Sequence, residues 1–376
     1  MATWSGTPYF IARALEAAGF QLDYIGPLSI RNPFWYKIKG KFFRMRGWDY
    51  INLGEEAVLR DYARQAQPFL RQSHGKILFS CGKPHLTYLD TQLPIIFFDD
   101  GSVPSITSSH PGHMRFHPKL KAKLLQSEQG ILEKCFAACY MSDWAADAAL
   151  KEYGYMFESK IMVLPIGPNI ACLPTEKEIE IAILGRDHKN CRLLMVGVNW
   201  EHKGGSIAVA ATKELRRRGV PAVLHVVGCT PPRQLPDYVR IHGFVSKKTE
   251  AGRALLAELF RESHFLILPT RAEAYGLAFV EASAHGIPSL GTAVGGVKTI
   301  LHENENGWLF PFDAPPSQYA DRIHTVWSDP KSYVQFCRSA LRSSQTRLSW
   351  GQFGETVVRL AESAIKQLAA SRSRCS

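Results

Sequence analysis

The sequence predicts an α/β protein whose two domains each contain a parallel sheet and face each other across a cleft. Short β-rich runs alternate with helical stretches from one end of the chain to the other, which is typical of parallel α/β folds. Several runs in the second half are almost continuously apolar, as parallel strands covered on both faces are. At 376 residues the chain also exceeds one typical domain.

The first half contains the less regular pattern. Helices are expected at 55–72 and 143–154. Strands are expected at 21–27, 76–80, 94–100, 135–142 and 160–167. The chain begins directly at a turn before a helix, so the strand that usually opens such a domain is expected to be missing, with a truncated copy or an upstream start as the two explanations.

The second half has the clearer strands, each followed by a helix. They are expected at 192–198, 222–228, 239–244, 264–270 and 287–292. Prolines, glycines and charged residues between Pro165 and Asn190 mark the best boundary. We therefore predict Rossmann-like domains at 1–168 and 169–350, and a helix within 351–376 that crosses back to the first domain.

Composition narrows the function classes. No apolar run approaches the ~18 residues of a membrane span, and the N-terminus lacks the layout of a signal peptide, so a cytoplasmic protein is expected. The eight scattered cysteines suit reduced thiols better than disulfides or a zinc site. A net charge of +11 favours an anionic partner, such as nucleic acid, anionic lipid or a phosphorylated small molecule.

The stretch TRAEAYGLAFVEASAHG places carboxylates at Glu273 and Glu281 around a helix expected to begin near Gly276. Glu281 falls within the apolar stripe of that helix, where a carboxylate is costly unless it is paired or reaches a polar ligand. Helical geometry over the whole stretch would separate the two acids by ~12 Å along the axis. The helix N-terminus between them suits an anion. A nucleotide sugar fits this arrangement; an arginine partner for Glu281 and an ordinary helix-start role for Glu273 is the alternative.

The segment LPTRAEAYGLAFVEASAHGIPSLGTAVGGVKTIL resembles the donor site of glycosyltransferase family 4, whose members are retaining enzymes of the GT-B fold. LLMVGVNWEHKGG resembles the phosphate-binding segment of that family, and VRIHGFV its base-contacting loop. The resemblance covers nearly the whole chain and is strongest over 192–310. It implies a sugar transfer with retention at the anomeric carbon, without a metal or other cofactor.

The resemblance also implies roles for individual residues. Glu281 would bind the ribose hydroxyls, Glu273 a hydroxyl of the donor sugar, and Lys203 the diphosphate. Other donor contacts are expected from Gly276, Leu277, Tyr275, Phe244, Val245 and Gly6. One departure is Val198, which stands where the family commonly has an arginine, and its presence puts the rate of turnover in question.

The first domain is expected to bind the acceptor. Asp99 and Asp100 end a predicted strand, where ligands of open α/β sheets bind, and Asp100 is the candidate for orienting the acceptor hydroxyl; helix capping is the alternative. His110, His113 and His117 have no acidic or thiol ligand in their spacing, so a loop on the acceptor side is favoured over a metal site.

The segment 31–48 contains six Lys or Arg, six aromatic residues and no acid. This composition suits contact with an anionic membrane or an anionic acceptor, and inward-packed aromatics with solvated charges are the alternative. Single-stranded nucleic acid would suit it too, but no nucleic-acid signature accompanies it.

We therefore predict a glycosyltransferase that uses a UDP- or GDP-sugar donor and a saccharide or lipid-linked acceptor. A cytoplasmic location with peripheral membrane contact is expected. The alternatives are a non-catalytic nucleotide-sugar-binding protein, and an epimerase or phosphorylase of the same architecture.

Overall fold

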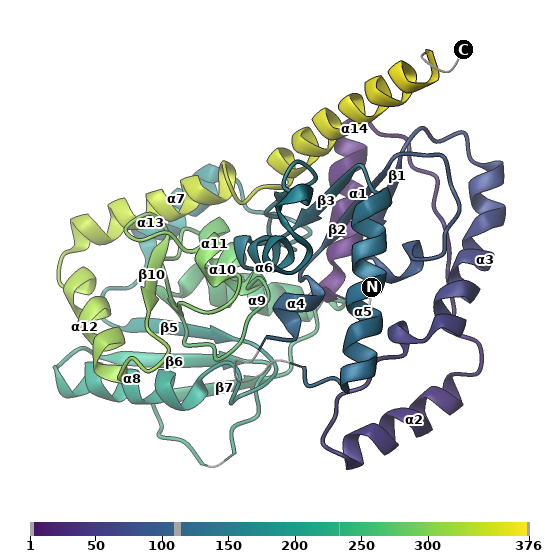
Figure 1. Ribbon diagram of the computed structural model, residues 1–376. Coiled ribbons are helices and arrows are strands. Elements are labelled where there is room, and N and C mark those ends of the chain that lie inside the picture. Colours follow the sequence, from purple (N-terminus) through teal and green to yellow (C-terminus); the bar gives the residue numbers. More distant parts are fainter. Residues whose placement is uncertain (1–3, 109–113, 233, 374–376) are drawn as a thin grey trace. The chain divides into compact units, whose positions relative to one another are not determined.

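The protein is described by a computed structural model of residues 4–108, 114–232 and 234–373. Its contacts divide the chain into two compact units. Unit 1 consists of Met1–Pro165 and Trp350–Ser376, and unit 2 of Ile166–Ser349. Each unit has its own parallel sheet covered by helices (Figure 1), so the predicted α/β fold with two parallel sheets is confirmed.

In the described part of unit 1, two short 3-10 turns and three α-helices precede the first strand. Its helices are α1 (Thr7–Ala17), α2 (Pro33–Met45), α3 (Glu56–Gln72), α4 (Val103–Ile106), α5 (Pro118–Lys134), α6 (Asp143–Tyr153) and α14 (Trp350–Ser373). Its 3-10 turns are η1 (Trp4–Gly6), η2 (Asn52–Gly54), η3 (Pro84–Leu86) and η4 (Tyr155–Phe157). Its strands are β1 (Leu78–Cys81), β2 (Ile95–Asp99), β3 (Ala137–Tyr140) and β4 (Ile161–Val163).

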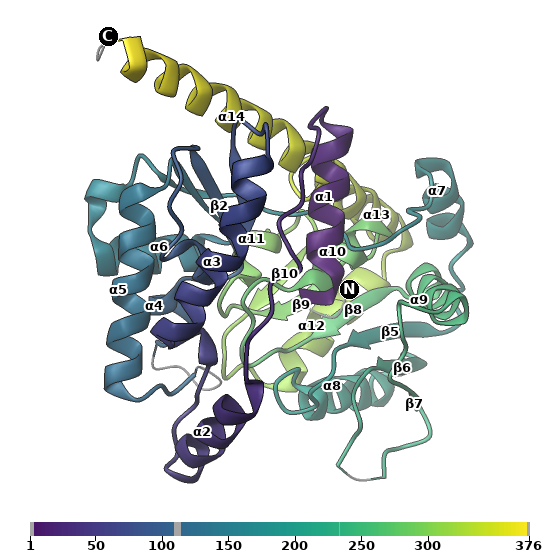
Figure 2. The same ribbon diagram turned by 90° about the vertical axis from the view of Figure 1, so that its right-hand side faces the viewer.

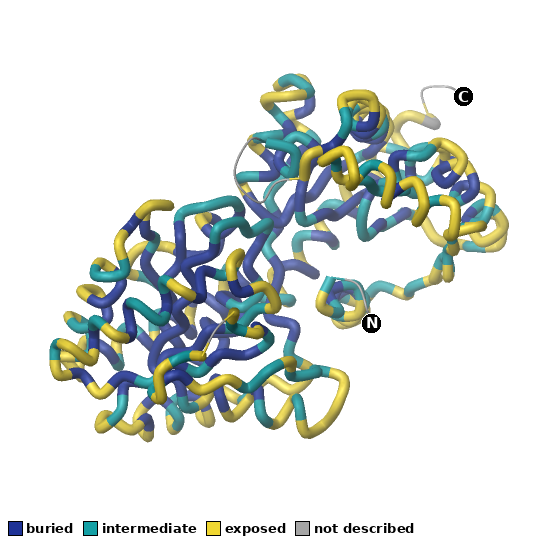
Figure 3. Tube along the Cα trace, turned by 90° about the horizontal axis from the view of Figure 1, so that it is seen from below, coloured by how far each residue is buried: buried dark blue, intermediate teal, exposed yellow. Residues whose placement is uncertain are grey.

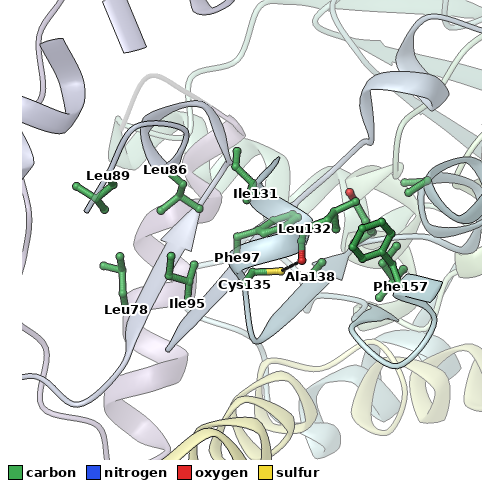
Figure 4. Packing of buried hydrophobic residues seen from close by; sticks show 14 of the residues in the cluster. Leu78, Leu86, Leu89, Ile95, Phe97, Ile131, Leu132, Cys135, Ala138 and Phe157 are labelled. Atoms are coloured by element: carbon green, nitrogen blue, oxygen red, sulfur yellow. Dashed lines mark hydrogen bonds between the residues drawn. The ribbon is translucent and has the colours of Figure 1, made fainter. Parts of the chain in front are cut away.

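The strands of unit 1 pair in chain order, β1-β2-β3-β4, without a gap between neighbours. All five residues of β2 are buried, as a central strand between two helical layers must be. One cluster of buried residues joins the sheet to α3, α5 and α6, and Phe97, Leu132 and Ala138 lie at its centre (Figure 4). This cluster is the main core of the unit.

The C-terminal helix α14 packs on unit 1 against α1 (Figure 2). A Cβ atom added at Gly354 would lie 3.0 Å from Ala18 Cβ, so glycine allows the two helices to approach closely. Phe353 is fully buried, and its ring lies 5.2 Å from that of Phe98 on β2. The helix thus covers part of the sheet with large aromatic contacts.

Unit 2 contains the longer run of alternating strands and helices. Its strands are β5 (Cys191–Val196), β6 (Ala222–Val227), β7 (Val239–Gly243), β8 (Phe265–Leu268), β9 (Ser289–Thr292) and β10 (Gly307–Phe310). Its helices are α7 (Glu176–Gly185), α8 (Gly205–Arg217), α9 (Glu250–Glu262), α10 (Leu277–Ala284), α11 (Val297–Ile300), α12 (Pro316–Trp327) and α13 (Pro330–Gln345).

The six parallel strands of unit 2 have the order β10-β9-β8-β5-β6-β7. The chain starts near the middle of the sheet at β5, adds β6 and β7 on one side, and returns to add β8, β9 and β10 on the other. This is a doubly wound sheet, in which the strand order reverses between β5 and β8. Strands β5, β6, β8 and β9 are largely buried, and the helices around them expose their outer faces (Figure 3).

The expected strand at 21–27 is wrong. Residues 20–30 have no regular structure. Pro27 has no backbone N–H to donate to a ladder, and Tyr24 is 65% exposed. The apolar residues Ile25 and Leu28 instead pack from outside against the core cluster. The other strands predicted for the first half correspond to β1 to β4, while β10 in unit 2 was not predicted.

Within the described residues, no helix combines the length and the apolar character required to cross a bilayer. The seven described cysteines are all free thiols, and five of them are buried. This agrees with the reduced thiols predicted from the scattered spacing of the cysteines. Cys172 is the exposed one among those described.

Candidate active site

The candidate site lies at the carboxyl ends of β5 and β8, which are neighbours in the sheet of unit 2. Open parallel sheets bind ligands where the strand order reverses, because the loops leaving the two strands turn to opposite faces and leave room between them. The loops that leave here are 197–204 after β5 and 269–276 after β8. They carry the predicted residues Lys203, Glu273 and Gly276.

The two loops pack backbone against backbone. Gly204 has a φ of +70°, and a Cβ atom added there would lie 2.1 Å from the carbonyl oxygen of Pro269. The carbonyl oxygen of His202 accepts hydrogen bonds from Thr270 Oγ1 at 3.0 Å and from the backbone N–H of Arg271 at 2.7 Å. The loop that carries Lys203 is therefore fixed to the loop that carries Glu273.

Lys203 and Glu273, both predicted to act in catalysis, form an ion pair between Nζ and Oε2. Their side chains are 20% and 16% exposed, so the pair is shielded but reachable from solvent. The stem of Lys203 runs over Gly197, where an added Cβ atom would lie 2.5 Å from Lys203 Cγ. Because Gly197 has no side chain, the Lys203 side chain can pass over it and bring its ammonium group to Glu273.

The glycine pair at 295–296 holds the backbone of Glu273. The N–H of Gly296 donates to the carbonyl oxygen of Glu273 at 3.0 Å. A Cβ atom added at Gly295 would lie 1.9 Å from that same oxygen. Glu273 precedes α10, which begins at Leu277, so the ~12 Å separation derived from continuous helical geometry does not apply.

The N-terminus of α10 faces the same region. Gly276 is its N-cap with a φ of +106°, a conformation that favours glycine. Among the described residues, no side chain caps this helix. The N–H of Phe279 donates to the carbonyl oxygen of Gly276 at 2.9 Å, so the amides of Leu277 and Ala278 are the ones left for solvent or a ligand. A Cβ atom at Gly276 would lie 3.3 Å from Glu273 Cγ. An anion bound at this N-terminus would therefore lie near the Lys203–Glu273 pair.

Tyr275, a predicted donor-binding residue, is buried, and its hydroxyl group is engaged by the backbone of Ile166. The hydroxyl donates to the carbonyl oxygen of Ile166 at 2.9 Å and accepts from its N–H at 2.8 Å. Burial raises the pKa of Tyr275. The side chain anchors the loop before α10 to the first residue of unit 2.

Glu281 lies on the buried side of α10 and is only 2% exposed. Its Oε1 atom forms an ion pair with Nζ of Lys247, whose side chain is 37% exposed. Burial raises the pKa of Glu281 above its ordinary value, and the charge and hydrogen bond of Lys247 oppose that shift. A carboxylate is thus held inside the domain with one partner that reaches solvent.

Lys247 was not predicted as a site residue. It stands in the segment after β7 that also carries Phe244 and Val245, the residues expected to border the base. Phe244 is 76% exposed, as a ring available for stacking would be. Two consecutive lysines at 247–248, one residue after HGFV, were the available signal. The expected alternative partner for Glu281 was an arginine, and the structure shows a lysine instead.

Val198, the departure from the family pattern, is 71% exposed beside Gly197. Nearby Arg271 does not replace the absent arginine. Its guanidinium group lies 3.3 Å from the ring centroid of Phe312 and donates to the carbonyl oxygen of that residue. Lys203 is therefore the cation that the loop after β5 presents at the strand ends.

In unit 1, Asp99 and Asp100 follow β2 as predicted strand-end carboxylates. Asp99 Oδ2 accepts from Lys83 Nζ at 2.8 Å, and Lys83 also lies 3.0 Å from Glu128. Asp100 has a different environment: burial, followed by repulsion from Asp99, raises its pKa to about 7. Asp99 belongs to a buried ion-pair network, whereas Asp100 can change its charge near neutral pH.

The remaining candidate site residues of unit 1 are Gly6 and the three histidines, and the two that the structure describes cap helices. Gly6 is the N-cap of α1 with a φ of +85°, and an added Cβ atom would meet nothing within 4 Å. His117 caps α5 by accepting from the N–H of Lys119 at 3.3 Å. His110 and His113 lie outside the described residues. In the part of the chain that the structure describes, no three His, Cys, Asp or Glu side chains are grouped closely enough to hold a metal ion.

Unit 2 is thus a doubly wound α/β domain with the Lys203–Glu273 pair at the point where its strand order reverses, which is where ligands of open α/β sheets bind. The model of the family described as glycosyl transferases group 1 matches residues 190–329. This match contains β5 to β10 and all the residues named in the site of unit 2. The resemblance found in the sequence is thus confirmed for the part of the chain that carries the candidate site.

Individual proteins agree with this assignment. D-inositol 3-phosphate glycosyltransferase of Kineococcus radiotolerans is 28% identical over 237 residues, which cover 57% of this chain and 54% of that protein. The chain therefore spans about half the length of this relative.

Two solved structures show the same fold. Sucrose-phosphate synthase of Thermosynechococcus elongatus has a TM-score of 0.62 at 19% identity, covering 86% of this chain and 81% of its own. The Anabaena protein Alr3699/HepE, in complex with UDP and glucose, has a TM-score of 0.56 at 14% identity, covering 91% and 84%. The fold is GT-B, as predicted.

Proposed function

We propose that the protein is a retaining glycosyltransferase that moves a sugar from a UDP- or GDP-sugar to an acceptor hydroxyl without a metal ion. The observation that carries this proposal is the presence of two lysine–glutamate pairs, Lys203–Glu273 and Lys247–Glu281, in the donor domain. The family match and the named activity of the relative support a hexosyl transfer. Alr3699/HepE, of the same fold, is described in complex with UDP.

The pairs supply the groups that a nucleotide sugar needs. A diphosphate would draw Lys203 toward itself and accept hydrogen bonds from the first amides of α10. Glu273 would then be free to accept hydrogen bonds from the donor sugar, and Glu281 from the ribose hydroxyls. Lys203 and the helix N-terminus stabilise the negative charge that grows on the departing diphosphate, which is the task a metal ion performs elsewhere.

Transfer with retention breaks the bond between the anomeric carbon and the phosphate oxygen and forms the new bond to the acceptor on the same face. The acceptor proton passes to the departing phosphate oxygen, so no enzyme nucleophile is needed. In unit 1, we assign Asp100 to positioning the acceptor, because its ionised form can accept a hydrogen bond from a hydroxyl group. A saccharide or a lipid-linked saccharide is the proposed acceptor.

We further propose that the enzyme acts in the cytoplasm at an anionic membrane surface, which α2 contacts. In Figures 1 and 2 this helix stands out from the rest of unit 1, and Gly40 is its one buried residue. Five large apolar side chains of α2 are exposed: Phe34, Trp35, Ile38, Phe42 and Met45. Basic side chains from the same segment flank them. Exposed aromatics among cations suit the interface of an anionic bilayer.

The test of the activity is release of UDP or GDP from a panel of nucleotide sugars, with and without saccharide acceptors and with a chelator present throughout. Turnover of one donor that Lys203→Ala slows and Lys213→Ala leaves unchanged would support the proposal. Lys213 is an exposed lysine of α8 and serves as the matched control. Tight donor binding with no turnover would instead support the alternative of a non-catalytic nucleotide-sugar-binding protein.

A further inference from the structure

A pocket of unit 1 lies between the loop before α2, the start of α2 and the first turns of α3. Its volume is about 260 Å³, and its lining includes Arg31, Trp35, Tyr36, Asp61 and Arg64. The pocket is remote in sequence from the strand-end carboxylates of this unit. It combines one buried acid with two cations and two aromatic rings, which are groups that can bind a polar, charged ligand.

Asp61 forms the buried part of this pocket at 6% exposure. Its Oδ2 atom accepts from Gln65 Nε2 at 2.8 Å. Gln65 is itself fixed, because it bonds both the N–H and the carbonyl oxygen of Ser29, at 2.9 and 2.8 Å. The second oxygen, Oδ1, accepts no hydrogen bond from any described residue. An Nη atom of Arg64 forms an ion pair with Oδ1 without a well-directed hydrogen bond, so Oδ1 keeps acceptor capacity for a ligand hydroxyl.

The two arginines stand at the rim of the pocket beside this acid. Arg31 Nε lies 3.4 Å from Asp61 Oδ2, and an Nη atom of Arg64 lies 3.2 Å from Oδ1. Their side chains are 73% and 72% exposed, so most of their N–H donors face solvent. Two guanidinium groups against one carboxylate leave the site a net positive charge. Guanidinium donors in this number match the oxygens of a phosphate.

The ligand chemistry follows from these parts together. Oδ1 of Asp61 can accept from a hydroxyl donor, the exposed N–H groups of Arg31 and Arg64 can bind a phosphate, and Trp35 offers a ring face to the carbon backbone of a polyol. A cavity of this size holds a small head group and not an acyl chain. The pocket opens at the N-terminal end of α2, whose exposed apolar side chains would enter the bilayer. This identifies a lipid, rather than a free phosphate ester, as the source.

We propose that this pocket binds the head group of an anionic phospholipid that carries free hydroxyl groups next to its phosphate. The inference rests on the membrane contact proposed for α2 and adds selectivity to it. Asp61 would accept a hydrogen bond from a head-group hydroxyl, while Arg31 and Arg64 would bind the phosphate. The enzyme would thus prefer one class of anionic surface over others of equal charge.

The test compares two vesicle types that differ in the head group alone. Phosphatidylcholine vesicles are doped with equal mole fractions of phosphatidylglycerol or phosphatidylmethanol, which carry the same charge, and cosedimentation of the full chain is measured. We expect about tenfold tighter binding to the phosphatidylglycerol vesicles, the effect of a hydrogen bond to a charged group. Equal binding to the two vesicle types would rule out head-group recognition by the pocket, but it would leave the proposed membrane contact of α2 standing.

Variants separate the roles. Asp61→Ala should abolish the preference without weakening binding to phosphatidylmethanol vesicles, because it removes the hydroxyl acceptor and a negative charge together. Arg64→Gln should weaken binding to phosphatidylglycerol vesicles more than Arg71→Gln does. Arg71 is an exposed arginine of the same helix outside the pocket, and these two surface changes leave the buried Asp61 in place.

A soluble source gives a different result. Free glycerol 3-phosphate that binds the protein, together with no preference between the vesicles, would reassign the pocket to a soluble ligand and overturn the lipid assignment. Binding to neither vesicle type would remove the membrane contact of α2 and this inference with it. Neither result bears on donor turnover, which is measured without vesicles.

Discussion

Lys247 reaches from the segment after β7 to the buried carboxylate of Glu281 on α10, and so joins the two ends of the candidate donor site. The segment 244–247 carries both the exposed ring expected near the base and the cation that pairs with Glu281, the acid proposed to bind the ribose. In the proposed donor complex, base and ribose recognition would be coupled through this one loop. A ligand that binds Glu281 must compete with Lys247 or recruit it.

Removal of this cation should destabilise the protein at neutral pH. Lys247→Gln leaves Glu281 buried without its partner, and we expect a loss of about 1–3 kcal/mol in the free energy of unfolding, at the lower end because Lys247 is partly exposed. Lys248→Gln, at the exposed neighbouring lysine, should change little. Urea denaturation of the three proteins measures this.

The loss of unfolding free energy caused by Lys247→Gln should also depend on pH. Burial raises the folded-state pKa of Glu281 above its unfolded value, so this group favours the folded state at pH values below the unfolded pKa and loses that contribution as the pH rises through the folded pKa. Without Lys247 the folded pKa rises further. The difference between variant and parent should therefore shrink on acidification, and a difference that grew at low pH would contradict the pairing.

Neutralising Glu281, the acid proposed to bind the ribose, should weaken donor binding. Glu281→Gln keeps the shape of the side chain but removes a charged acceptor, and we expect the Kd of UDP to rise about tenfold or more. Calorimetric titration of UDP measures it, with Glu250→Gln at an exposed position of α9 as the control. An unchanged Kd would remove Glu281 from the site.

Lys203→Ala should reduce kcat more than it raises KM. The ammonium group counters charge that develops on the leaving diphosphate, and loss of one such group slows the reaction by about 10²–10³. Steady-state kinetics with the best donor separate the two parameters. An effect confined to KM would show that Lys203 binds the donor equally in the ground and transition states.

Asp100 should make transfer dependent on pH. Its pKa is raised to about 7 by burial and by Asp99, and only the ionised form accepts a hydrogen bond through both oxygens. Transfer to the acceptor should therefore increase as the pH rises through about 7, and Asp100→Asn should flatten that part of the profile. The exposed Asp90→Asn serves as the control. The same rise in the Asp100→Asn profile would exclude this role.

Unit 2 could be predicted largely from sequence because its patterns are local. Apolar strands bounded by glycine turns gave β5 to β9, and the spacing of Glu273, Gly276 and Glu281 predicted a loop followed by a helix N-terminus. Contacts between distant segments could not be read in this way. The pairing of Lys247 with Glu281 joins residues 34 positions apart, and no periodicity within either segment encodes it.

The first half was harder to interpret for a related reason. Residues 21–27 have the composition of a strand, but whether such a segment enters a sheet depends on a neighbouring strand with free N–H and C=O groups. The segment instead lies over the core through Ile25 and Leu28. The pocket around Asp61 likewise arises from two separate segments, at 30–36 and 57–64. The sequence alone therefore indicated the basic and aromatic composition of 31–48, but not the site beside it.

The central claim is that unit 2 binds a nucleotide sugar with its acids on the hydroxyl groups and its lysine on the diphosphate. A crystal structure of the protein soaked with the donor that it turns over tests this most directly. The account predicts Glu281 within hydrogen-bond distance of the ribose hydroxyls and Lys203 moved from Glu273 to the diphosphate at the N-terminus of α10. A donor bound elsewhere, with both lysine–glutamate pairs unchanged, would contradict it.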